Sequence, residues 1–308
     1  MLKIGLICNT SAAFPLLQWL HSQGVLCGIL ALENESDFCA DVSSISQQLN
    51  ISLTYLQKNI ISDQLIAWQS INRPDLVLVL GFPYKIAIEV FEIPKFGFYN
   101  IHFGKLPIYG GSFPVFWQII NQEKEAVLTI HKINQSLDNG PIAIEIPFEL
   151  KPEHTHGLVE MNFGMIAINA VYYLIDNLLN SKLSLKNQPE KSAQYYPRPS
   201  LNELIIDWEN YEASQIVALI NAANPWNKGA IARINNLDLK IIEAEIGKPI
   251  ESNDFGKIIA INQSGAQVIC AKNTSIIITI VYSQLGYFSA GKLETLGINS
   301  GQIFTKLN

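Results

Sequence analysis

The chain has 308 residues, of which 48% are hydrophobic and 16% are charged, and its net charge is −6. This length and composition suit two domains with packed cores. Only three arginines occur, Arg73, Arg198 and Arg233. Because a protein that binds nucleic acid needs an excess of basic side chains to neutralise phosphates, the composition disfavours a polyanionic partner.

No stretch reaches the ~18 consecutive apolar residues that a membrane-spanning helix needs. Residues 1–8 are typical of a buried strand and not of a secretion signal. We therefore expect a cytoplasmic protein without membrane contact. The four cysteines, Cys8, Cys27, Cys39 and Cys270, form no C-x-x-C pair. Their spacing favours isolated thiols over disulfides or a metal site.

The first half of the chain alternates strand-like and helix-like segments. Strands are predicted at 3–8, 25–32, 52–56, 75–80, 97–101, 127–133 and 142–148. Helices are predicted from Phe14 to Leu20 and at 42–49, 60–71 and 157–179. Such alternation is typical of βαβ units, so the expected fold class is α/β, Rossmann-like, with a mostly parallel sheet.

The second half has a different pattern. Residues 180–203 are polar and interrupted by prolines, which suits a linker. A short helix is predicted at 213–223, followed by strands at 229–235, 237–244, 257–262, 266–271 and 275–282. Short strands separated by Asn/Gly turns predict a small β-barrel. The expected division is therefore an α/β domain at 1–190, a linker at 191–203 and a barrel domain at 204–308.

The turn after the first strand lacks the G-x-G-x-x-G sequence of dinucleotide-binding domains. The segment Asn9-Thr10-Ser11-Ala12-Ala13 has no glycine that would bring the backbone close to a pyrophosphate. NAD binding is therefore disfavoured, although the fold class is compatible with it.

Residues suited to proton transfer gather after two strands. Asn100 and His102 stand two apart at the end of a predicted strand, so their side chains point to the same face. Strand ends are where α/β sheets bind ligands. Asp138 follows the next strand in a tight polar turn. Such a set suits acyl transfer, in which His moves protons, an Asn amide donates to the oxyanion and Asp orients the imidazole.

A histidine after a strand is more often hydrogen-bonded scaffolding than a catalyst, so these three residues alone favour the structural interpretation. The same holds for other histidines. His154 and His156 have no third ligand placed by spacing, which favours surface residues over a metal pair. His131 lies two residues after Thr129 in a strand, which favours packing or support of the site over direct catalysis.

A longer series of residues strengthens the catalytic interpretation. Asn100-x-His102, Leu106-Pro107-x-Tyr109-x-Gly111, Pro114, Trp117, Thr129-Ile130-His131 and Leu137-Asp138-x-Gly140 resemble the signature of the formyltransferase family, as does the 36-residue step from His102 to Asp138. Ile206-Asp207-Trp208, Asn224-Pro225-Trp226-x-x-Gly229-Ala230 and Leu296-Gly297-x-x-x-Gly301 resemble the C-terminal part of its methionyl-tRNA and amino-sugar members. The resemblance covers nearly the whole chain.

This resemblance implies that 10-formyltetrahydrofolate is the formyl donor and that the second domain is an OB-like barrel. It implies that His102 is the general acid/base and that Asn100 stabilises the oxyanion. Asp138 would hold His102 and raise its pKa by opposite charge. The implied folate contacts are Phe82, Tyr84, Lys85, Ile86, Asn134, Gln135, Ser136 and Leu137.

Contacts to the acceptor are expected at Thr10, Ser11, Tyr109, Ser112 and Arg198. Arg198 follows aromatic residues in the predicted linker and could clamp a phosphate or carboxylate, although a surface arginine is as well supported. The loop after His102 departs from the family, since Gly104-Lys105 replaces Ser-Leu and Gly110 replaces an arginine. These changes spare the chemistry and bear on cofactor-loop contacts and acceptor type.

We expect formyl transfer to the amine of a small acceptor, either a nucleotide-linked amino sugar or a natural-product amine or hydroxylamine. The alternative is methionyl-tRNA formylation, which the two-domain layout fits equally well. Residues 207–308 hold eight Lys+Arg and nine Asp+Glu, so the barrel has no basic excess to receive tRNA. Less favoured are a formyltetrahydrofolate hydrolase, whose relatives carry an extra N-terminal domain, and a folate-binding protein without catalysis. The pattern leaves the oligomeric state open.

Overall fold

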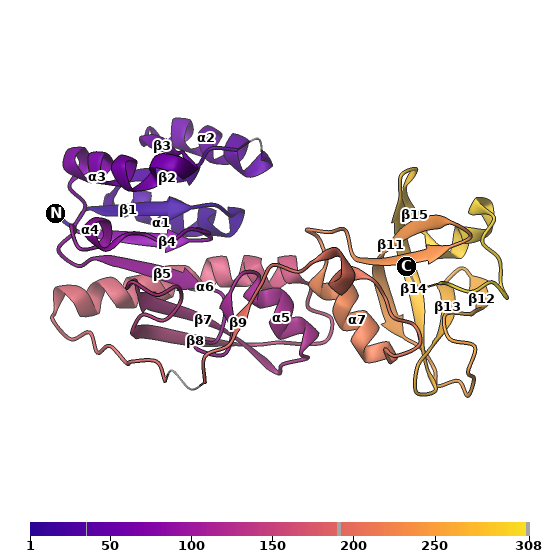
Figure 1. The fold of residues 1–308 in the computed structure, drawn as a ribbon. Helices are drawn as coiled ribbons and strands as arrows, with labels where there is room; N and C mark the ends of the chain where they lie inside the picture. Colours follow the sequence, from indigo (N-terminus) through magenta and orange to yellow (C-terminus); the bar gives the residue numbers. More distant parts are fainter. Residues whose placement is uncertain (35, 190–191, 306–308) are drawn as a thin grey trace. The chain divides into compact units, whose positions relative to one another are not determined.

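The computed structural model describes residues 1–34, 36–189 and 192–305, which form two compact units (Figure 1). The first unit comprises residues 1–114, 126–148 and 160–196. The second comprises residues 115–125, 149–159 and the chain from Pro197 onwards.

The first unit is built on a seven-stranded sheet with the order β3-β2-β1-β4-β5-β7-β8. Its strands are β1 (Ile4–Cys8), β2 (Leu26–Leu32), β3 (Leu53–Leu56), β4 (Leu76–Leu80), β5 (Phe98–His102), β7 (Glu125–Lys132) and β8 (Ile142–Glu149). β1 and β4 are apolar and buried at every position, as expected for strands covered on both faces. The strands from β3 to β5 run parallel, whereas β5 and β7 are antiparallel. The predicted mostly parallel sheet is confirmed, with strand ends shifted by one or two residues.

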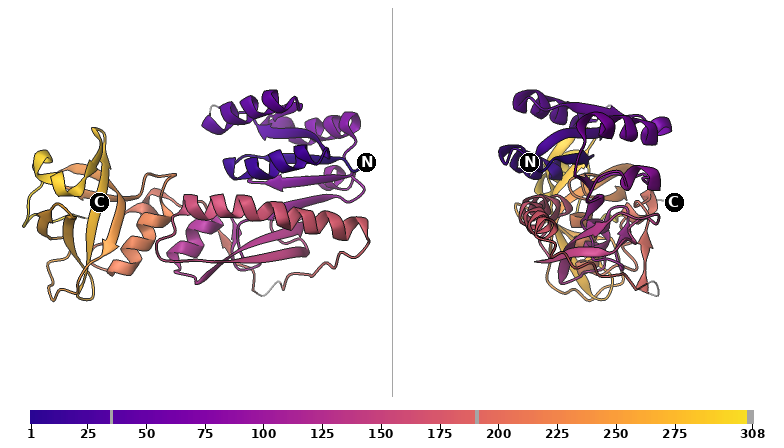
Figure 2. Two further views of the ribbon diagram at one scale, coloured as in Figure 1. Left: turned by 180° about the vertical axis from the view of Figure 1, so that it is seen from behind. Right: turned by 90° about the vertical axis from the view of Figure 1, so that its left-hand side faces the viewer.

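Helices lie on both faces of this sheet, with α1 and α6 on one side and α3 and α4 on the other (Figure 2). The helices are α1 (Phe14–Ser22), α2 (Asp37–Leu49), α3 (Ile61–Asn72), α4 (Ile88–Phe91), α5 (Pro114–Ile120) and α6 (His156–Leu179). α2 begins earlier than the sequence predicts. Its buried face is formed by Cys39, Val42 and Ser46, and only the valine gives a strong apolar signal. α4 and α5 are too short to leave a helical period in the sequence.

Helix α3 packs on the sheet through Trp68, which is 5% exposed. Its ring lies over two glycines of neighbouring strands. A Cβ atom would lie 2.5 Å from the ring at Gly5 and 3.0 Å from it at Gly28. The absence of side chains at both positions therefore permits the close approach of helix and sheet.

Helix α6 is, within the described part of the chain, the one helix whose length and apolar composition would suffice to cross a membrane. One set of its side chains is buried at a helical period: Phe163, Ala167, Ala170, Val171 and Leu174. Another set is exposed: Met161, Met165, Tyr172 and Tyr173. A buried stripe of this width is typical of a helix that packs on a protein core.

The second unit is built on a six-stranded antiparallel sheet with the order β10-β11-β14-β13-β12, in which β15 pairs with β14. Its strands are β10 (Ala230–Ile234), β11 (Leu237–Ile246), β12 (Ile258–Asn262), β13 (Gly265–Cys270), β14 (Thr274–Ser283) and β15 (Gly286–Ser289). Helix α7 (Ala213–Ala222) is buried at all positions but Ser214 and Gln215. The five predicted strands and this helix are confirmed. β15 has four residues and the following 3-10 helix, Ala290–Leu296, has no α-helical period, so neither was predicted.

Part of the predicted linker is paired with the first unit. β9 (Tyr195–Tyr196) runs parallel to β6 (Gly110–Gly111), and the rings of Tyr109 and Tyr196 stack with their centroids 5.4 Å apart. Two-residue strands carry no sequence period, so only the structure reveals this pairing. The first unit accordingly extends to Tyr196.

Replacement of Trp68 by alanine tests whether this side chain holds α3 on the sheet. We expect Trp68→Ala to lower the free energy of unfolding by about 3–5 kcal/mol, because the cavity left under α3 cannot close fully over Gly5 and Gly28. Urea denaturation followed by circular dichroism measures the change. Ile71→Ala, at a 79% exposed position of the same helix, is the matched control and should change stability by less than about 0.5 kcal/mol. Equal effects of both substitutions would contradict this role of Trp68.

Candidate functional site

The antiparallel pairing of β5 and β7 brings four polar side chains to one region. Asn100 lies opposite His131 and His102 lies opposite Thr129 in the strand register. Since side chains two apart on a strand share a face, the two cross-strand pairs lie side by side. His102, Thr129 and His131 are buried.

Asn100 connects the members of this cluster. Its Nδ2 lies 3.2 Å from His131 Nε2 and 3.4 Å from Asp138 Oδ1. An amide nitrogen can only donate, so the Asn100 contact requires a lone pair on His131 Nε2, whereas the nearby Asp138 carboxylate favours a hydrogen on that atom. His131 Nδ1 lies 3.3 Å from the Lys132 carbonyl oxygen. The ring thereby orients the Asn100 amide toward Asp138.

His102 is held by the loop that follows it. Its Nε2 lies 2.6 Å from the Tyr109 carbonyl oxygen. A carbonyl can only accept, so Nε2–H donates and the lone pair of the neutral ring is on Nδ1. Thr129 Oγ1 donates to the Gly104 carbonyl at 2.7 Å. A Cβ at Gly104 would lie 2.7 Å from His102 Nε2, which explains why this loop carries glycine there.

Asp138 is placed by a closed loop. Residues 133–140 leave β7 and return beside it, since Lys132 N–H donates to the Pro141 carbonyl at 2.9 Å. Asp138 has a φ of 52°, a left-handed conformation that Asp tolerates better than most residues. Its Oδ2 accepts from Gly111 N–H at 2.8 Å, and its own carbonyl accepts from Gln188 Nε2 at 2.9 Å. β6 and the segment around Gln188 thus hold the carboxylate in place.

The carboxylate lies nearer to His131 than the sequence indicated. Asp138 Oδ1 is 3.6 Å from His131 Nε2, and within the described residues Asp138 makes no hydrogen bond to His102. Burial raises the pKa of Asp138, but His102, the contact with His131 and the Gly111 N–H together lower it to about 2. Asp138 is therefore a carboxylate at neutral pH.

The pKa of His102 is lowered, although Asp138 acts in the expected direction and raises it. Burial of the ring has the largest effect and favours the neutral form. Asp138 and the Tyr109 carbonyl do raise the pKa, and nearby His131 lowers it. The predicted direction of the Asp138 effect was right, but desolvation outweighs it.

A cavity opens beside this cluster at the end of β4. Seven of the eight residues expected to contact a folate line it: Phe82, Tyr84, Lys85, Ile86, Asn134, Ser136 and Leu137. Asn100, His131 and Asp138 form its inner end. Gln135 is exposed and is not among the lining residues. The cavity measures about 40 Å³, and the Phe82 and Tyr84 side chains that line it are half-buried.

The residues expected to contact an acceptor lie in three separate segments of the chain and differ in burial. Thr10 follows β1 and caps the short 3-10 helix that Ser11 begins, accepting from Ala12 N–H at 3.3 Å. Tyr109 is buried and stacked. Ser112 is exposed and its N–H donates to the Tyr196 carbonyl at 2.9 Å. Arg198 belongs to the second unit.

Two features of the site were not assigned from the sequence. Gln188 supports the Asp138 loop from a polar segment that shows no periodic pattern. Tyr196 fixes the loop after His102 by stacking on Tyr109. A tyrosine pair beside the prolines of the linker was the only available signal.

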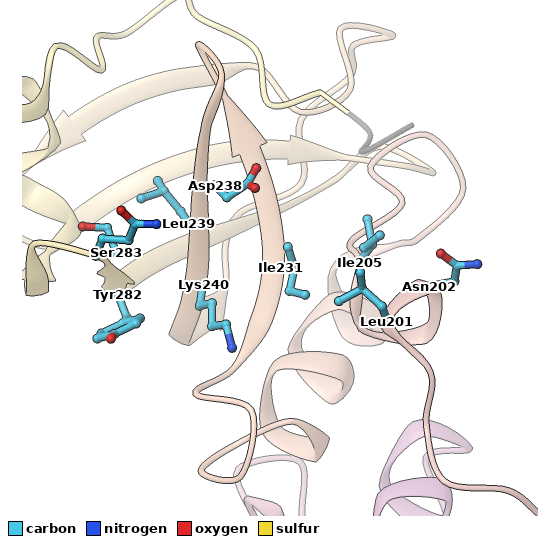
Figure 3. A pocket seen from close by; sticks show the side chains of 10 residues that line it. Leu201, Asn202, Ile205, Ile231, Asp238, Leu239, Lys240, Tyr282 and Ser283 are labelled. Atoms are coloured by element: carbon cyan, nitrogen blue, oxygen red, sulfur yellow. The ribbon is translucent and has the colours of Figure 1, made fainter.

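The second unit has a cavity of its own, of about 360 Å³ (Figure 3). Leu201, Ile205 and Ile231 form an apolar wall, and Lys240 and Tyr282 extend from the outer face of the sheet. The charged groups there already have partners: Asp238 accepts two hydrogen bonds from Arg233, at 2.6 and 2.9 Å, and Lys240 donates to Asn227. This cavity lacks the acid–base set of the first unit.

The paired histidines of the α6 region have other neighbours. His154 Nδ1 accepts from Lys151 N–H at 3.2 Å. His156 is buried with its ring 6.4 Å from that of Trp226, and burial lowers the pKa of His156 to about 4. Among the described residues no group of three His, Cys, Asp or Glu side chains is placed to bind a metal ion.

Two family models match the chain. The model described as "Formyl transferase" matches residues 35–168, and "Formyl transferase, C-terminal domain" matches residues 200–285. Among curated proteins, the methionyl-tRNA formyltransferase of Pelagibacter ubique is 30% identical over 210 residues, which are 68% of this chain and 66% of the relative. The corresponding protein of Geobacter metallireducens is 26% identical over 237 residues, 76% of this chain and 73% of its own. The match thus spans about two thirds of the first relative's length.

Solved structures share the fold at lower identity. WlaRD, a sugar 3N-formyl transferase determined with dTDP and 5-N-formyl-THF, matches with a TM-score of 0.68 and 20% identity over 90% of this chain and 97% of its own. An N-formyltransferase from Helicobacter canadensis, in complex with folinic acid and dTDP-3-aminofucose, matches with a TM-score of 0.69 and 18% identity. The match covers 90% of this chain and 99% of that protein. A variant of HypX from Aquifex aeolicus matches with a TM-score of 0.70 and 15% identity, over 96% of this chain and 48% of HypX.

The low pKa of Asp138 makes stability depend on pH. A carboxyl whose pKa falls from 3.8 to about 2 on folding stabilises the fold above pH ~4 and loses this contribution as the pH falls toward 2. We expect Asp138→Asn to lower the free energy of unfolding by about 2 kcal/mol at pH 7 and by progressively less below pH 4. Denaturant titrations at pH 7 and pH 3 measure this difference. Asp41→Asn, an exposed site on α2, is the control, and a pH-independent effect of Asp138→Asn would contradict the assignment.

Proposed function

This chain belongs to the folate-dependent formyltransferase family, and from that premise we propose that it moves a formyl group from 10-formyltetrahydrofolate to the amine of a small acceptor. The observation that carries the proposal is the cluster of Asn100, His131 and Asp138 in a cavity lined by the expected folate contacts, with the buried His102 two residues from Asn100 on the same face of β5. We also propose that the antiparallel unit is the OB-like barrel of this family.

The cluster supplies the groups that formyl transfer requires. The neutral amine attacks the formyl carbon, and the carbonyl oxygen becomes an oxyanion that needs a hydrogen-bond donor. One Asn100 N–H is held by His131, and the other reaches Asp138 over 3.4 Å, a long hydrogen bond. This second N–H is the one that would turn to the oxyanion.

His102 would carry the proton between amine and leaving group. Attack makes the amine nitrogen cationic, and the lone pair on His102 Nδ1 would accept its proton. Collapse of the intermediate then breaks the bond between the formyl carbon and N10 of tetrahydrofolate, and His102 donates the proton to N10. Asp138, ionised at neutral pH, would stabilise the transient imidazolium at a distance, as its effect on the pKa of His102 indicates.

The proposed binding site for the folate donor is the cavity at the end of β4. Phe82 and Tyr84 meet edge to face with ring centroids 5.8 Å apart, and aromatic side chains of this kind suit a flat pterin ring. The solved relatives with folate derivatives in their names are consistent with this donor. We assign the remaining expected folate contact, Gln135, to the outer rim.

The proposed acceptor class depends on the charge of the second unit and on the solved structures that are similar to this chain. The second unit has no basic excess from residue 207 onwards, with eight Lys+Arg against nine Asp+Glu, which favours a small molecule over tRNA. WlaRD is described as a sugar 3N-formyl transferase with dTDP, and the Helicobacter canadensis enzyme is described with dTDP-3-aminofucose. We retain Thr10, Ser11, Tyr109, Ser112 and Arg198 as proposed acceptor contacts.

A second candidate function is formylation of methionyl-tRNA, because the curated relatives at up to 30% identity carry that name. The two functions differ in their response to salt. A tRNA acceptor makes several phosphate contacts, so its affinity falls about a thousandfold or more between 50 and 200 mM salt. An amino-sugar acceptor does not have this dependence.

Loss of either central side chain tests the reaction. We expect His102→Ala and Asn100→Ala each to lower kcat by about 100- to 1,000-fold, because proton transfer and oxyanion stabilisation are removed. Release of tetrahydrofolate with a panel of amino sugars and hydroxylamines measures the rate. His21→Gln, a partly exposed histidine of α1, should leave it unchanged. Turnover with none of the amines by wild-type protein, or equal rates with His102→Ala, would refute the proposal.

The pH dependence of kcat/KM tests the state of His102. Because burial lowers its pKa, the ring remains a neutral base below pH 6.5, and the acidic limb of the profile should lie below that value. Asp138 raises the pKa of His102, so Asp138→Asn should move the limb to still lower pH as well as slow the reaction. A limb above pH 6.5, or one that moves upward in the variant, would contradict this electrostatic arrangement.

Acceptor choice is tested with both substrates in parallel. We expect turnover with a nucleotide-linked amino sugar and a KM for it that changes less than about threefold between 50 and 200 mM salt, because few phosphate contacts are made. Initiator methionyl-tRNA serves as the comparison. Formylation of the tRNA with steeply salt-dependent KM would establish the second candidate instead.

A further inference from the structure

The cavity of the second unit is built across three neighbouring strands (Figure 3). In the strand register Ile231 of β10 lies opposite Lys240 of β11, which in turn lies opposite Tyr282 of β14. Because residues directly opposite each other on paired strands share a face, their three side chains form one row. The row is apolar at Ile231 and polar at Lys240 and Tyr282.

A short helix closes the apolar end of this row. The 3-10 helix Leu201–Leu204 is anchored on both sides, because Leu204 is buried and Ile206 N–H donates to the Ile231 carbonyl at 2.9 Å. Leu201 lines the cavity and is 66% exposed, so an apolar ligand gains free energy by covering it. The cavity of about 360 Å³ lies within the range of small-molecule sites.

Two ammonium groups lie at the polar end, and within the described residues no ion pair joins either one to a carboxylate. Lys240 Nζ donates to the carbonyl oxygen and to Oδ1 of Asn227, at 2.6 and 3.0 Å, and both acceptors are uncharged. An ammonium group has three N–H donors, so a third remains for a ligand. Lys228 Nζ lies 4.2 Å from the centre of the Tyr282 ring.

The electrostatic surroundings of these lysines favour a bound anion. Partial burial of its side chain and repulsion from Lys228 lower the pKa of Lys240. The acidic residue of the lining, Asp238, accepts two hydrogen bonds from Arg233 and is neutralised by it. An anion beside Lys240 would offset the repulsion between the two ammonium groups.

We propose that this cavity binds a small aliphatic carboxylate whose charged group pairs with Lys240. Its hydrocarbon chain covers Leu201, Ile205 and Ile231. The unneutralised lysines select a negative charge, and the apolar wall selects a hydrocarbon body. Neither inorganic phosphate nor a neutral alcohol satisfies both ends. The site lies within the second unit, so it is independent of the proposed formyl transfer.

Affinity should depend separately on chain length and on charge. Each added CH₂ that is buried against the wall should raise affinity about two- to fourfold until the chain fills the cavity. Replacement of the carboxylate by a hydroxyl group should lower affinity about three- to tenfold, because the ion pair with a half-buried lysine is lost. Octanoate should therefore bind with a Kd on the order of 1 mM.

An NMR titration of the full chain with butanoate, hexanoate, octanoate and 1-hexanol tests the site. Lys240→Gln keeps an N–H donor for Asn227 and removes the charge, so hexanoate should lose its advantage over 1-hexanol. Leu201→Ser, at an exposed position, should lower the affinity for octanoate about three- to fivefold and leave that for butanoate nearly unchanged. Lys292→Gln, an exposed lysine of the 3-10 helix Ala290–Leu296 and outside the cavity, is the matched control and should bind like wild type.

Equal affinities of the wild-type protein for hexanoate and 1-hexanol would overturn the proposal. Affinities that do not rise from butanoate to octanoate would overturn it as well. Inorganic phosphate that binds as tightly as octanoate would reveal a site that recognises charge alone. Unchanged selectivity in Lys240→Gln, together with unchanged octanoate affinity in Leu201→Ser, would place the ligand elsewhere on the chain and refute this site.

Discussion

The antiparallel pairing of β5 with β7 is the constraint on which the site depends. In a sheet whose other paired strands from β3 to β5 run parallel, this reversal sets Asn100 opposite His131 and His102 opposite Thr129. It also makes β7 end beside the start of β5, since Ile133 N–H donates to the Phe98 carbonyl at 2.8 Å. Loop 133–140 must then return along the sheet, and that return carries Asp138 to Asn100.

Burial decides the electrostatics of this cluster. A carboxylate beside an imidazole ordinarily favours the charged ring, and here it does raise the pKa of His102. The ring is 6% exposed, however, and the loss of hydration weakens its charged form more than Asp138 strengthens it. The same pair therefore combines an ionised Asp with a neutral His. That combination suits a base that receives a proton for a moment and returns it.

Much of this arrangement could be predicted from the sequence, because it depends on local patterns. Apolar runs gave the strands of both units, and the two-residue spacing of Asn100 and His102 placed them on one face. The contact between Asp138 and His131 could not be predicted, since it depends on strand register and on a loop with a left-handed residue. The β6–β9 pair and the Gln188 support join segments 85 and 50 residues apart in the chain, and two-residue strands or a lone glutamine leave no period. The lowered pKa of His102 depends on burial of its ring, which residue spacing in the sequence does not reveal.

The two sides of the Asn100–His102 cluster are held by constraints of different strength. On one side, the cavity beside Asn100 is bounded by β4, β5 and loop 133–140, all tied to the sheet by backbone hydrogen bonds. On the side of the loop after His102, the restraint is a two-residue strand pair and a stack of two tyrosines. Gly104 and Gly110 in that loop lack the side chains that the family usually carries there. A Cβ at Gly110 would lie 3.1 Å from the Gln194 carbonyl oxygen, so a side chain at that position requires a small shift of residue 194, which precedes β9. The glycine at position 110 thus permits the close approach of this loop to the segment before β9.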